Sequence, residues 1–369
     1  MRLLLAAGGT GGHVFPALAL AAEAALGGHQ TLLIGARGGM EERLAAEASV
    51  PFVGVPAGKW DRQRPDPRQA WHALRGLGVA LAATRRYAPD VTVAFGGFAS
   101  FPGCVASVLT RTPLVLHEGN AYPGRVTRWF AGRARAVALA LPEAAPRLPG
   151  ARRLETVGFP VRETRIDRLE ARRRLGVPGE GLLTLAMGGS QGSLALNEAV
   201  PAAYRQLPTP SRGAVLHATG PRWLEAVEDA TSDLPSYRTT GFVDATLAWS
   251  AADLALVRAG VGTLSEAAYH AVPLVMLPLP TAADDHQRHN ARAVAAAGGG
   301  RAVEQDDLAA ITDAWRSFLD AETRAIASAK IAARSPEGAA ARLLSVAQAA
   351  ARPGEPPTTT TSRAEEGQR

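Results

Sequence analysis

Two glycine-rich loops that follow apolar strand-like runs could each hold a phosphate group. The first loop, residues 8–12, ends at His13 and leads into an Ala-rich helical pattern. Glycines at such a turn let backbone amides approach a diphosphate at the positive end of a helix. The loop does not fit the G-x-G-x-x-G register of dinucleotide-binding proteins, because Val14 or Phe15 would stand at the third glycine. It therefore indicates another anionic ligand.

The second loop, residues 188–192, gives the clearer chemical signal. It follows an apolar run at 182–187 and precedes a helix predicted from Leu194, so backbone amides and the Ser190 hydroxyl converge at a helix N-terminus. A diphosphate fits there. The loop lacks the Lys and Ser/Thr of a P-loop, which argues against phosphoryl transfer. A tight turn that needs glycine only for packing remains the alternative for this loop taken alone.

A third glycine turn, residues 258–263, is followed by Glu266 in the first turns of a predicted helix. A carboxylate there could accept hydrogen bonds from two ribose hydroxyls while the amides of Gly262 and Thr263 meet a phosphate. The alternative is that Glu266 only favours a helix N-terminus. Polar side chains also gather after a later strand, and side chains in that position suit a sugar; they are Asp284, His286, Gln287 and Asn290.

The apolar runs that position these loops alternate with helical patterns in two series, which join near residues 158–165. Alternation of this kind predicts parallel sheets with helices on both faces. We expect an α/β protein with two Rossmann-like, doubly wound domains facing a cleft. The domains would cover residues 1–160 and 161–350, and the last helix could pack back on the first domain. Residues 351–369 are polar, repetitive and Pro-rich, and we expect them to be disordered.

Composition narrows the class of protein. The chain has 369 residues, is 47% hydrophobic and contains a single cysteine, Cys104, which argues against a disulfide framework and favours a reducing compartment. No run of about 18 apolar residues without breakers predicts a membrane-spanning helix, and no leader segment is recognisable. Residues 1–160 carry 18 Arg and Lys against 10 Asp and Glu, whereas the remainder carries 22 against 24. A basic half suits an anionic membrane surface or nucleic acid, and no motif supports nucleic acid.

One stretch, residues 59–90, could form an amphipathic helix on a membrane surface. Each basic residue near anionic lipid contributes ~1 kcal/mol to such binding. The alternative is an ordinary helix of a βα unit that turns the same face to the core. The predicted membrane patch consists of Trp71, Leu74, Arg75, Leu77 and Leu81, beside Arg64, Arg68, Arg85 and Arg86.

Eight motifs, in order along residues 8–300, resemble those of the bacterial MurG family of peptidoglycan glycosyltransferases. They are GGTGGHVFPALALA, GGFASFPG, HEGNAYPG, VGFPVR, GGSQGS, GFVD, RAGVGTLSEAA and DHQRHNA. The resemblance implies a GT-B fold, no metal or other cofactor, and inverting transfer of N-acetylglucosamine from UDP-N-acetylglucosamine (UDP-GlcNAc). The acceptor would be the C4 hydroxyl of N-acetylmuramic acid (MurNAc) in lipid I, undecaprenyl-pyrophosphoryl-MurNAc-pentapeptide, giving lipid II. It further implies a peripheral enzyme on the anionic cytoplasmic face of the bacterial cell membrane.

The resemblance also implies site residues. Acceptor contacts would come from the first domain, at Gly8, Gly9, Thr10, Gly11, Gly12, His13, Gly96, Gly97, Ser100 and Asn120. Donor contacts would come from both sides of the cleft, at Thr10, Gly11, Gly12, Asn120, Arg162, Ser190, Gln191, Phe242, Val243, Gly262, Thr263, Glu266, His286 and Gln287.

His13 is the candidate catalytic residue. The attacking hydroxyl must lose a proton, and a general base contributes on the order of 10²–10⁴-fold in rate. A histidine at a helix start could equally donate a hydrogen bond to the diphosphate or have only a structural role. The helix dipole would lower its pKa. Charge on the departing UDP could be stabilised without a metal by Arg162 and the helix start at Ser190.

Three residues depart from the family pattern: Gly119, Phe159 and Phe101. The first two put in doubt hydrogen bonds near the cleft and hinge. Other functions stay open on this architecture: another lipid-linked UDP-sugar transferase, a UDP-sugar epimerase or a UDP-sugar-binding subunit without activity. A nicotinamide-dependent oxidoreductase is disfavoured, because the glycine fingerprint and the ribose-binding acid are missing. Sites on two domains further suggest that the cleft closes around its substrates.

Overall fold

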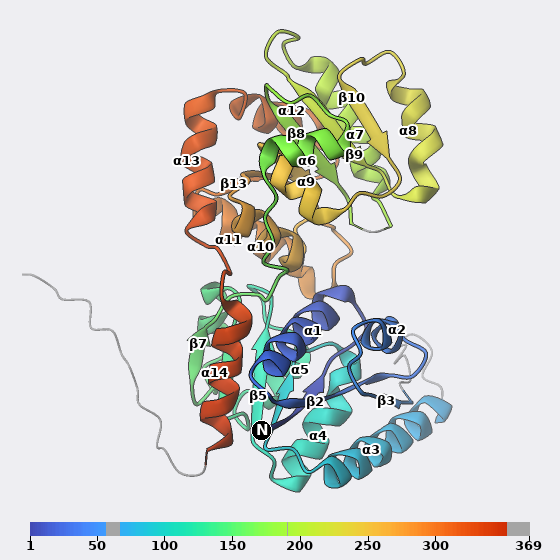
Figure 1. Cartoon of the computed structure of the whole chain (residues 1–369), viewed down its shortest axis with the longest axis vertical. Coiled ribbons are helices and arrows are strands. Elements are labelled where there is room, and N and C mark those ends of the chain that lie inside the picture. The colour runs from blue at the N-terminus through green and yellow to red at the C-terminus, as the bar shows by residue number, and fades with distance from the viewer. Residues whose placement is uncertain (57–66, 190, 353–369) are drawn as a thin grey trace, which may run out of the picture.

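The computed structural model describes residues 1–56, 67–189 and 191–352, and for residues 67–73 only their backbone. The described chain forms two lobes stacked along the long axis of the molecule (Figure 1), each built on a sheet of parallel strands. The strands of the first lobe are β1 Arg2–Ala6, β2 Gln30–Ala36, β3 Phe52–Val55, β4 Val91–Ala94, β5 Leu114–Glu118, β6 Ala136–Leu139 and β7 Leu154–Thr156. Those of the second are β8 Leu183–Met187, β9 Ala214–Ala218, β10 Tyr237–Thr240, β11 Leu254–Val257, β12 Leu274–Met276 and β13 Gly300–Ala302.

Helices cover both faces of each sheet. The first lobe carries α1 Gly11–Leu26, α2 Met40–Glu47, α3 Pro67–Tyr87, α4 Phe101–Thr110, α5 Arg125–Phe130 and α14 Ala339–Ala351. The second carries α6 Arg168–Leu175, α7 Leu194–Gln206, α8 Leu224–Thr231, α9 Ala245–Ala251, α10 Val261–His270, α11 His286–Ala296, α12 Leu308–Ser317 and α13 Ala321–Ala332. Short 3-10 turns lie at η1 Phe98–Ser100, η2 Pro142–Arg147, η3 Pro221–Trp223 and η4 Ala283–Asp285.

Both sheets are doubly wound. The strand orders are β3-β2-β1-β4-β5-β6-β7 and β10-β9-β8-β11-β12-β13, and every described pairing is parallel. The order reverses between β1 and β4 in the first lobe and between β8 and β11 in the second. Ligands of open α/β sheets bind at such reversal points, beyond the carboxyl ends of the strands. The three glycine turns of the sequence all lie there, which confirms the predicted fold class.

Local sequence explains where many of these elements begin. Central strands are continuous apolar runs because helices bury both of their faces; the side chains of Leu3, Leu4 and Leu5 in β1 are fully buried. Several helices of the second lobe begin at a side chain that accepts a hydrogen bond from the amide three residues on, which satisfies a free helical donor. These N-caps are Asp167, Ser193, Asp244, Asp307 and Asp320.

The chain crosses between the lobes twice. The first crossing follows β7, and the second, between α13 and α14, returns the chain to the first lobe (Figure 1). The two crossings touch, because a Cβ on Gly158, whose φ is +87°, would lie 3.2 Å from the Cα of Pro336. Helix α14 then buries Leu343 and Ala347 in the apolar core beneath the first sheet. The first lobe is therefore completed by α14, which follows the whole second lobe in the sequence.

Helix α3 serves the core as well as the surface. Leu81 is partly buried and packs against the core cluster that contains Leu4 and Ile34, which fits the alternative of a helix facing the core, and its place in a membrane patch stays a prediction. Leu74 and Arg75 are exposed, whereas the side chain of Trp71 lies outside the described residues. The periodicity was ambiguous because one helix can bury one edge of its apolar stripe and expose the other. Among the described helices, none is long and apolar enough to cross a membrane.

Candidate active site

A cleft of about 2610 Å³ lies between the lobes, at the carboxyl ends of both sheets. Most of the site residues expected from the sequence line it. From the first lobe and the crossing these are Thr10, Gly11, Gly12, His13, Gly96, Gly97, Asn120 and Arg162, and from the second lobe they are Phe242, Val243, Gly262, Thr263, Glu266, His286 and Gln287. The tertiary structure thus brings together residues that are more than 250 positions apart in the chain.

Four expected site residues of the described chain stand apart from that lining, and a fifth, Ser190, is not described. Gly8, Gly9 and Gln191 are not part of the cleft wall, and Ser190 lies outside the described residues. Ser100 is buried, and its hydroxyl donates to the carbonyl oxygen of Gly97 at 2.9 Å. Ser100 is thus placed to hold the second glycine loop of the first lobe.

The two glycine loops of the first lobe lie against each other beside His13. Gly97 has a φ of +74°, and a Cβ there would overlap the Gly8 carbonyl oxygen and lie 2.9 Å from Nδ1 of His13. A side chain at this position would therefore push the loops apart. Thr10 Oγ1 and Nδ1 of His13 share a hydrogen bond at 3.0 Å, which orients the imidazole.

His13 is neutral at pH 7. Burial lowers its pKa to about 4, and the positive charge of a protonated His286 would add to this effect, while a hydrogen bond to the Gly8 carbonyl opposes it. The sequence pointed to the helix end as the cause, but burial is the larger one. A neutral imidazole can accept a proton, as a general base requires.

The loop after β5 is held by a buried carboxylate. Glu118 accepts hydrogen bonds from the amides of Asn120 and Gly124, each at 2.9 Å. Burial raises the pKa of Glu118, and hydrogen bonds from Thr127, Asn120 and Gly124 counter that rise. Asn120 in turn faces the second lobe, where its Oδ1 accepts from Nδ2 of Asn290 at 3.1 Å.

Polar and aromatic contacts join the lobes beside Asn120. Asp284 forms ion pairs with Arg125 and with Arg128, both at 3.3 Å. Tyr122 stacks on His289 with ring centroids 4.9 Å apart. These contacts link α5 and the loop before it to η4 and α11, so they fix how far the cleft is open at this edge.

The two departures Gly119 and Phe159 are neighbours in space. A Cβ on Gly119 would lie 3.3 Å from the Phe159 ring and 3.2 Å from a methyl group of Val261. The Phe159 ring is buried with Ala140 and Val261, and its centroid lies 5.9 Å from that of His117. An apolar contact between the lobes therefore fills the space that a longer side chain at position 119 would need.

The glycine loop after β8 is fixed by neighbouring strands. A Cβ on Gly192, whose φ is +72°, would overlap the carbonyl oxygen of Thr219 in the loop after β9. Arg258, at the end of β11, donates to the Ser193 hydroxyl at 2.7 Å and to the carbonyl of Leu277 at 2.9 Å. Sequence reasoning missed this role of Arg258, because nothing local indicates which strand ends its guanidinium spans. Helix α7 begins at Leu194, as predicted.

Glu266 lies in the cleft wall, two turns into α10. Its Oε2 accepts a hydrogen bond from the indole Nε1 of Trp249 in α9 at 2.9 Å. Burial raises the pKa of Glu266, while the Trp249 hydrogen bond and the charge of Arg162 lower it. Gly262 and Thr263 are in the first turn of α10, where backbone amides have no partner within the helix. Sequence reasoning did not find Trp249.

The remaining donor candidates surround this helix start. Phe242 is 73% exposed at the mouth of the cleft, next to Val243. The side-chain oxygen of Gln287 accepts from the Leu279 amide at 3.0 Å, which leaves its NH₂ group for a ligand. Nδ1 of His286 pairs with the Ala283 carbonyl at 2.7 Å and is therefore the protonated nitrogen, so Nε2 is the acceptor in the neutral ring. Within the described residues, no group of three or more His, Cys, Asp or Glu is arranged to hold a metal ion.

Known proteins resemble this chain over nearly its whole length. The models of the glycosyltransferase family 28 N-terminal and C-terminal domains match residues 3–139 and 184–343. Two relatives are named UDP-N-acetylglucosamine–N-acetylmuramyl-(pentapeptide) pyrophosphoryl-undecaprenol N-acetylglucosamine transferase. The protein of Deinococcus deserti is 45% identical, covering 92% of this chain and 96% of its own. That of Thermus thermophilus is also 45% identical, covering 94% and 99%.

A solved structure agrees with these matches. The crystal structure of Acinetobacter baumannii MurG superposes with a TM-score of 0.80 at 27% identity, covering 94% of this chain and 99% of its own. The resemblance of the sequence motifs is thereby confirmed, and the protein is a glycosyltransferase with the GT-B fold. The chain belongs to glycosyltransferase family 28 and, within it, to the MurG family.

Proposed function

We propose that this enzyme transfers N-acetylglucosamine from UDP-GlcNAc to the MurNAc sugar of lipid I, forming the β-1,4 linkage of lipid II. The observation that carries the proposal is the position of His13. It stands beside the two glycine loops of the first lobe and lines the same cleft as His286 of the second lobe. An acceptor held on one lobe would thus meet a donor held on the other at this histidine.

The second lobe would hold the donor. Its diphosphate would lie at the start of α7 and near the first turn of α10, where free amides and the helix dipoles favour negative charge. The Glu266 carboxylate would accept hydrogen bonds from the ribose, with Trp249 fixing its orientation. Backbone groups at Phe242 and Val243 would contact the uracil, and Gln287 with His286 would contact the sugar hydroxyls.

Transfer would proceed by direct displacement. The MurNAc C4 hydroxyl attacks C1 of N-acetylglucosamine from the face opposite UDP, which inverts that carbon, and His13 takes the hydroxyl proton. As the C1–O bond to UDP breaks, negative charge grows on the diphosphate. Arg162 and the helix starts would stabilise that charge, so the mechanism as proposed needs no metal ion or other cofactor.

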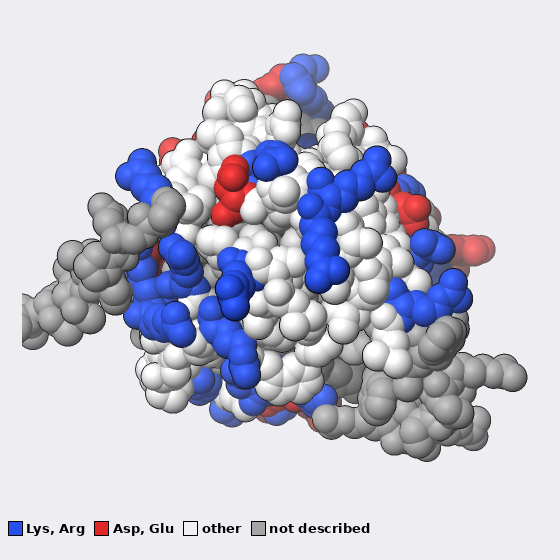
Figure 2. All heavy atoms as spheres, turned by 90° about the horizontal axis from the view of Figure 1, so that it is seen from below, with Lys and Arg blue, Asp and Glu red and all other residues white. Residues whose placement is uncertain are grey.

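The first lobe would hold lipid I at the membrane. The diphosphate of lipid I would lie on the loop residues 10–12 and 96–97. The cleft continues from there along exposed apolar side chains, which are Phe15, Leu26, Leu74, Phe98 and Trp129. Figure 2 shows the end of the first lobe remote from the second, where Lys and Arg far outnumber Asp and Glu. Exposed arginines stand where α3 and α4 end and before β6, at positions 85, 86, 111, 133 and 135. We propose that this end approaches the anionic cytoplasmic face of the cell membrane and binds it peripherally.

The test is UDP release from UDP-GlcNAc with a short-chain lipid I analogue as acceptor. UDP-N-acetylgalactosamine serves as the control donor, and added EDTA tests whether the reaction needs a metal ion. Acceptor-dependent release that is specific for the gluco donor and unaffected by EDTA is expected. Epimerisation of the donor without acceptor, or UDP binding without any turnover, would instead favour an epimerase or a binding-only protein.

A further inference from the structure

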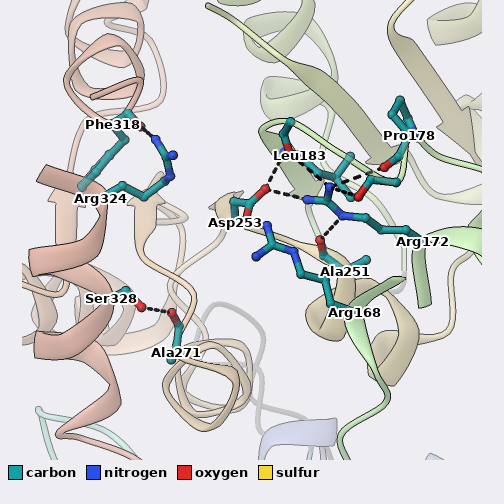
Figure 3. A network of polar contacts seen from close by, with 12 residues as sticks. Arg168, Arg172, Pro178, Leu183, Ala251, Asp253, Ala271, Phe318, Arg324 and Ser328 are labelled. Carbon is teal, nitrogen blue, oxygen red and sulfur yellow. Dashed lines mark hydrogen bonds and ion pairs between the residues drawn. The ribbon is translucent and has the colours of Figure 1, made fainter. Parts of the chain in front are cut away.

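A second cavity, of about 470 Å³, lies in the second lobe outside the cleft. Figure 3 shows its two sides, with Arg324 and Ser328 on α13 facing Arg168 of α6 and Asp253 across the gap. Arg165 and Ser250 add a third guanidinium and a second hydroxyl to its wall. The cavity is therefore polar and rich in hydrogen-bond donors, and nothing in the proposed transfer reaction uses it.

The charges in this wall do not cancel. Asp253 is already engaged, because its Oδ2 accepts from Arg172 at 2.7 Å and from the Leu183 amide at 2.8 Å, and its Oδ1 pairs with Arg168. Arg172 is buried, and its guanidinium group donates hydrogen bonds to Asp253 and to main-chain carbonyls, so it is not available to a ligand. The cavity wall thus holds three arginines against this one occupied carboxylate.

Arg324 has spare capacity for a ligand. One of its guanidinium nitrogens, Nη1, donates to the main-chain carbonyl of Phe318 at 2.7 Å, and the ion pairs among the described residues include none to Arg324. Burial lowers the pKa of Arg168, and the charge of Arg324, which lines the same cavity, lowers it further. Arg165 is better satisfied, because it pairs with Glu337 at 3.4 Å and stacks on Tyr269.

Such a wall suits a phosphate group. Guanidinium groups bind phosphate oxygens bidentately. The Ser250 hydroxyl accepts from the Ile166 amide and keeps its proton for a phosphate oxygen, whereas Ser328 donates its proton to the Ala271 carbonyl. His270 adds no charge at pH 7, because burial and the nearby Arg165 lower its pKa to about 4. The cavity volume has room for more than a single phosphate ion.

The cavity also shares its wall with the cleft. Trp249 and His270 line both the cavity and the cleft, and the Trp249 indole donates a hydrogen bond to the Glu266 carboxylate. We propose that this cavity is a second anion site, which binds a phosphate-bearing molecule through Arg168 and Arg324 and changes the affinity for the donor through Trp249. The coupling to the donor rests on the proposed function, whereas the anion site does not.

Calorimetry with inorganic pyrophosphate tests the site without any turnover. The full chain is first saturated with UDP, so that the donor diphosphate site is filled. Losing a charged hydrogen-bond partner costs about tenfold or more in affinity, so Arg168→Gln and Arg324→Gln should each weaken pyrophosphate binding by that factor. Arg174→Gln is the matched control, because Arg174 is on the same helix as Arg168 and pairs only with Glu170 among the described residues.

Arg324 also supports carbonyls at the end of α12, so Arg324→Lys, which keeps the charge, is measured beside Arg324→Gln. Partial binding by the lysine variant, with an unchanged melting temperature, supports the site. Equal affinity in all variants would place pyrophosphate on the glycine loops of the first lobe and overturn the proposal, as would no binding to the unmodified chain.

The coupling is read from the donor KM at rising pyrophosphate concentration. A change that saturates in the unmodified enzyme and is lost in Arg324→Gln, with kcat unaltered, is expected. If the donor KM instead rises without saturating, and equally in both proteins, pyrophosphate competes with the donor for its own site. That result would contradict the coupling. If no turnover is seen at all, the UDP dissociation constant gives the same comparison.

Discussion

Asn290 of the second lobe is hydrogen-bonded to Asn120 of the first lobe at 3.1 Å and, in the same place, accepts from the Ala121 amide at 2.8 Å. Its Nδ2 also donates to the Ala259 carbonyl at 3.2 Å. Asn290 is fully buried, so one side chain satisfies polar groups of both lobes where water cannot. It therefore fixes the Asn120 loop relative to the donor-binding lobe.

Replacing Asn290 should weaken the junction of the lobes. Asn290→Ala leaves buried groups at Ala121 and Ala259 unpaired, each costing about 1–3 kcal/mol. We expect a lower free energy of unfolding and a lower kcat. The control is Asn197→Ala, which breaks a bond to Thr219 within the second lobe only. Small-angle scattering should show a wider separation of the lobes for Asn290→Ala alone, and an unchanged separation would contradict the junction role.

His13→Ala should abolish most of the turnover and leave UDP binding intact. The expected fall in kcat is on the order of 10²–10⁴-fold for a lost general base. Because the pKa of His13 is lowered to about 4, kcat/KM should rise through that pH and then stay level until another group titrates. A loss of acceptor affinity without a loss of kcat would instead identify His13 as a diphosphate ligand.

Glu266→Gln should selectively weaken the binding of UDP. The substitution keeps an oxygen for the Trp249 indole, so the fold should be preserved, but the ribose hydroxyls lose a charged acceptor. A charge-assisted hydrogen bond contributes about 1.5–3 kcal/mol, so calorimetry should give a dissociation constant raised about tenfold or more. Glu225→Gln, exposed on α8, is the control for the loss of one negative charge. Equal affinities in the two variants would rule out the ribose contact.

Membrane binding should depend on exposed apolar side chains near the first-lobe end of the cleft. Leu74 is 64% exposed and Trp129 is 58% exposed. The double variant Leu74→Ser/Trp129→Ser should sediment less with vesicles that contain anionic phosphatidylglycerol, and binding of the unmodified chain should fall at high salt because screening weakens the arginine contribution. Leu169→Ser, which removes an exposed leucine of the second lobe, is the control. Binding that neither salt nor the double variant reduces would argue against this surface.

Buried histidines should make the fold labile in acid. Burial lowers the pKa of His117 to about 4 and that of His217 to about 3. Above pH 7 both states are neutral; as the pH falls from about 6.5 towards 4, the unfolded chain binds protons that the folded chain excludes, so stability is lost over that window. By pH 4 the loss is about 3 kcal/mol for each of these two residues.

Urea unfolding between pH 4 and pH 8 measures this loss. His217 pairs with the Tyr237 hydroxyl at 2.7 Å, so the double variant His217→Leu/Tyr237→Phe removes both partners and should make the pH dependence less steep, while the His117 contribution remains. The same steep dependence in the double variant would assign the acid lability to other groups.

The sequence predicted the local structure and the family of this protein correctly, because both depend on short spacings between residues, whereas the roles of the site residues stay predictions. Continuous apolar runs identified the central strands, and glycine turns marked the carboxyl ends where ligands bind. Helix α7 begins at the predicted Leu194, and the motif series identified the family. These features need only neighbouring residues and the periodicities of helix and strand.

Only the tertiary structure decided which distant groups meet. Trp249 reaches Glu266, Arg258 reaches Ser193, and Phe159 fills the space beside Gly119, all through strand order and packing that no local pattern encodes. The same holds for Leu81, whose place on α3 suited core or membrane equally and which the fold packs, partly buried, against the core cluster of Leu4 and Ile34. Periodicity specifies which face of an element is apolar, whereas its packing partner is set by the topology and shape of the whole fold.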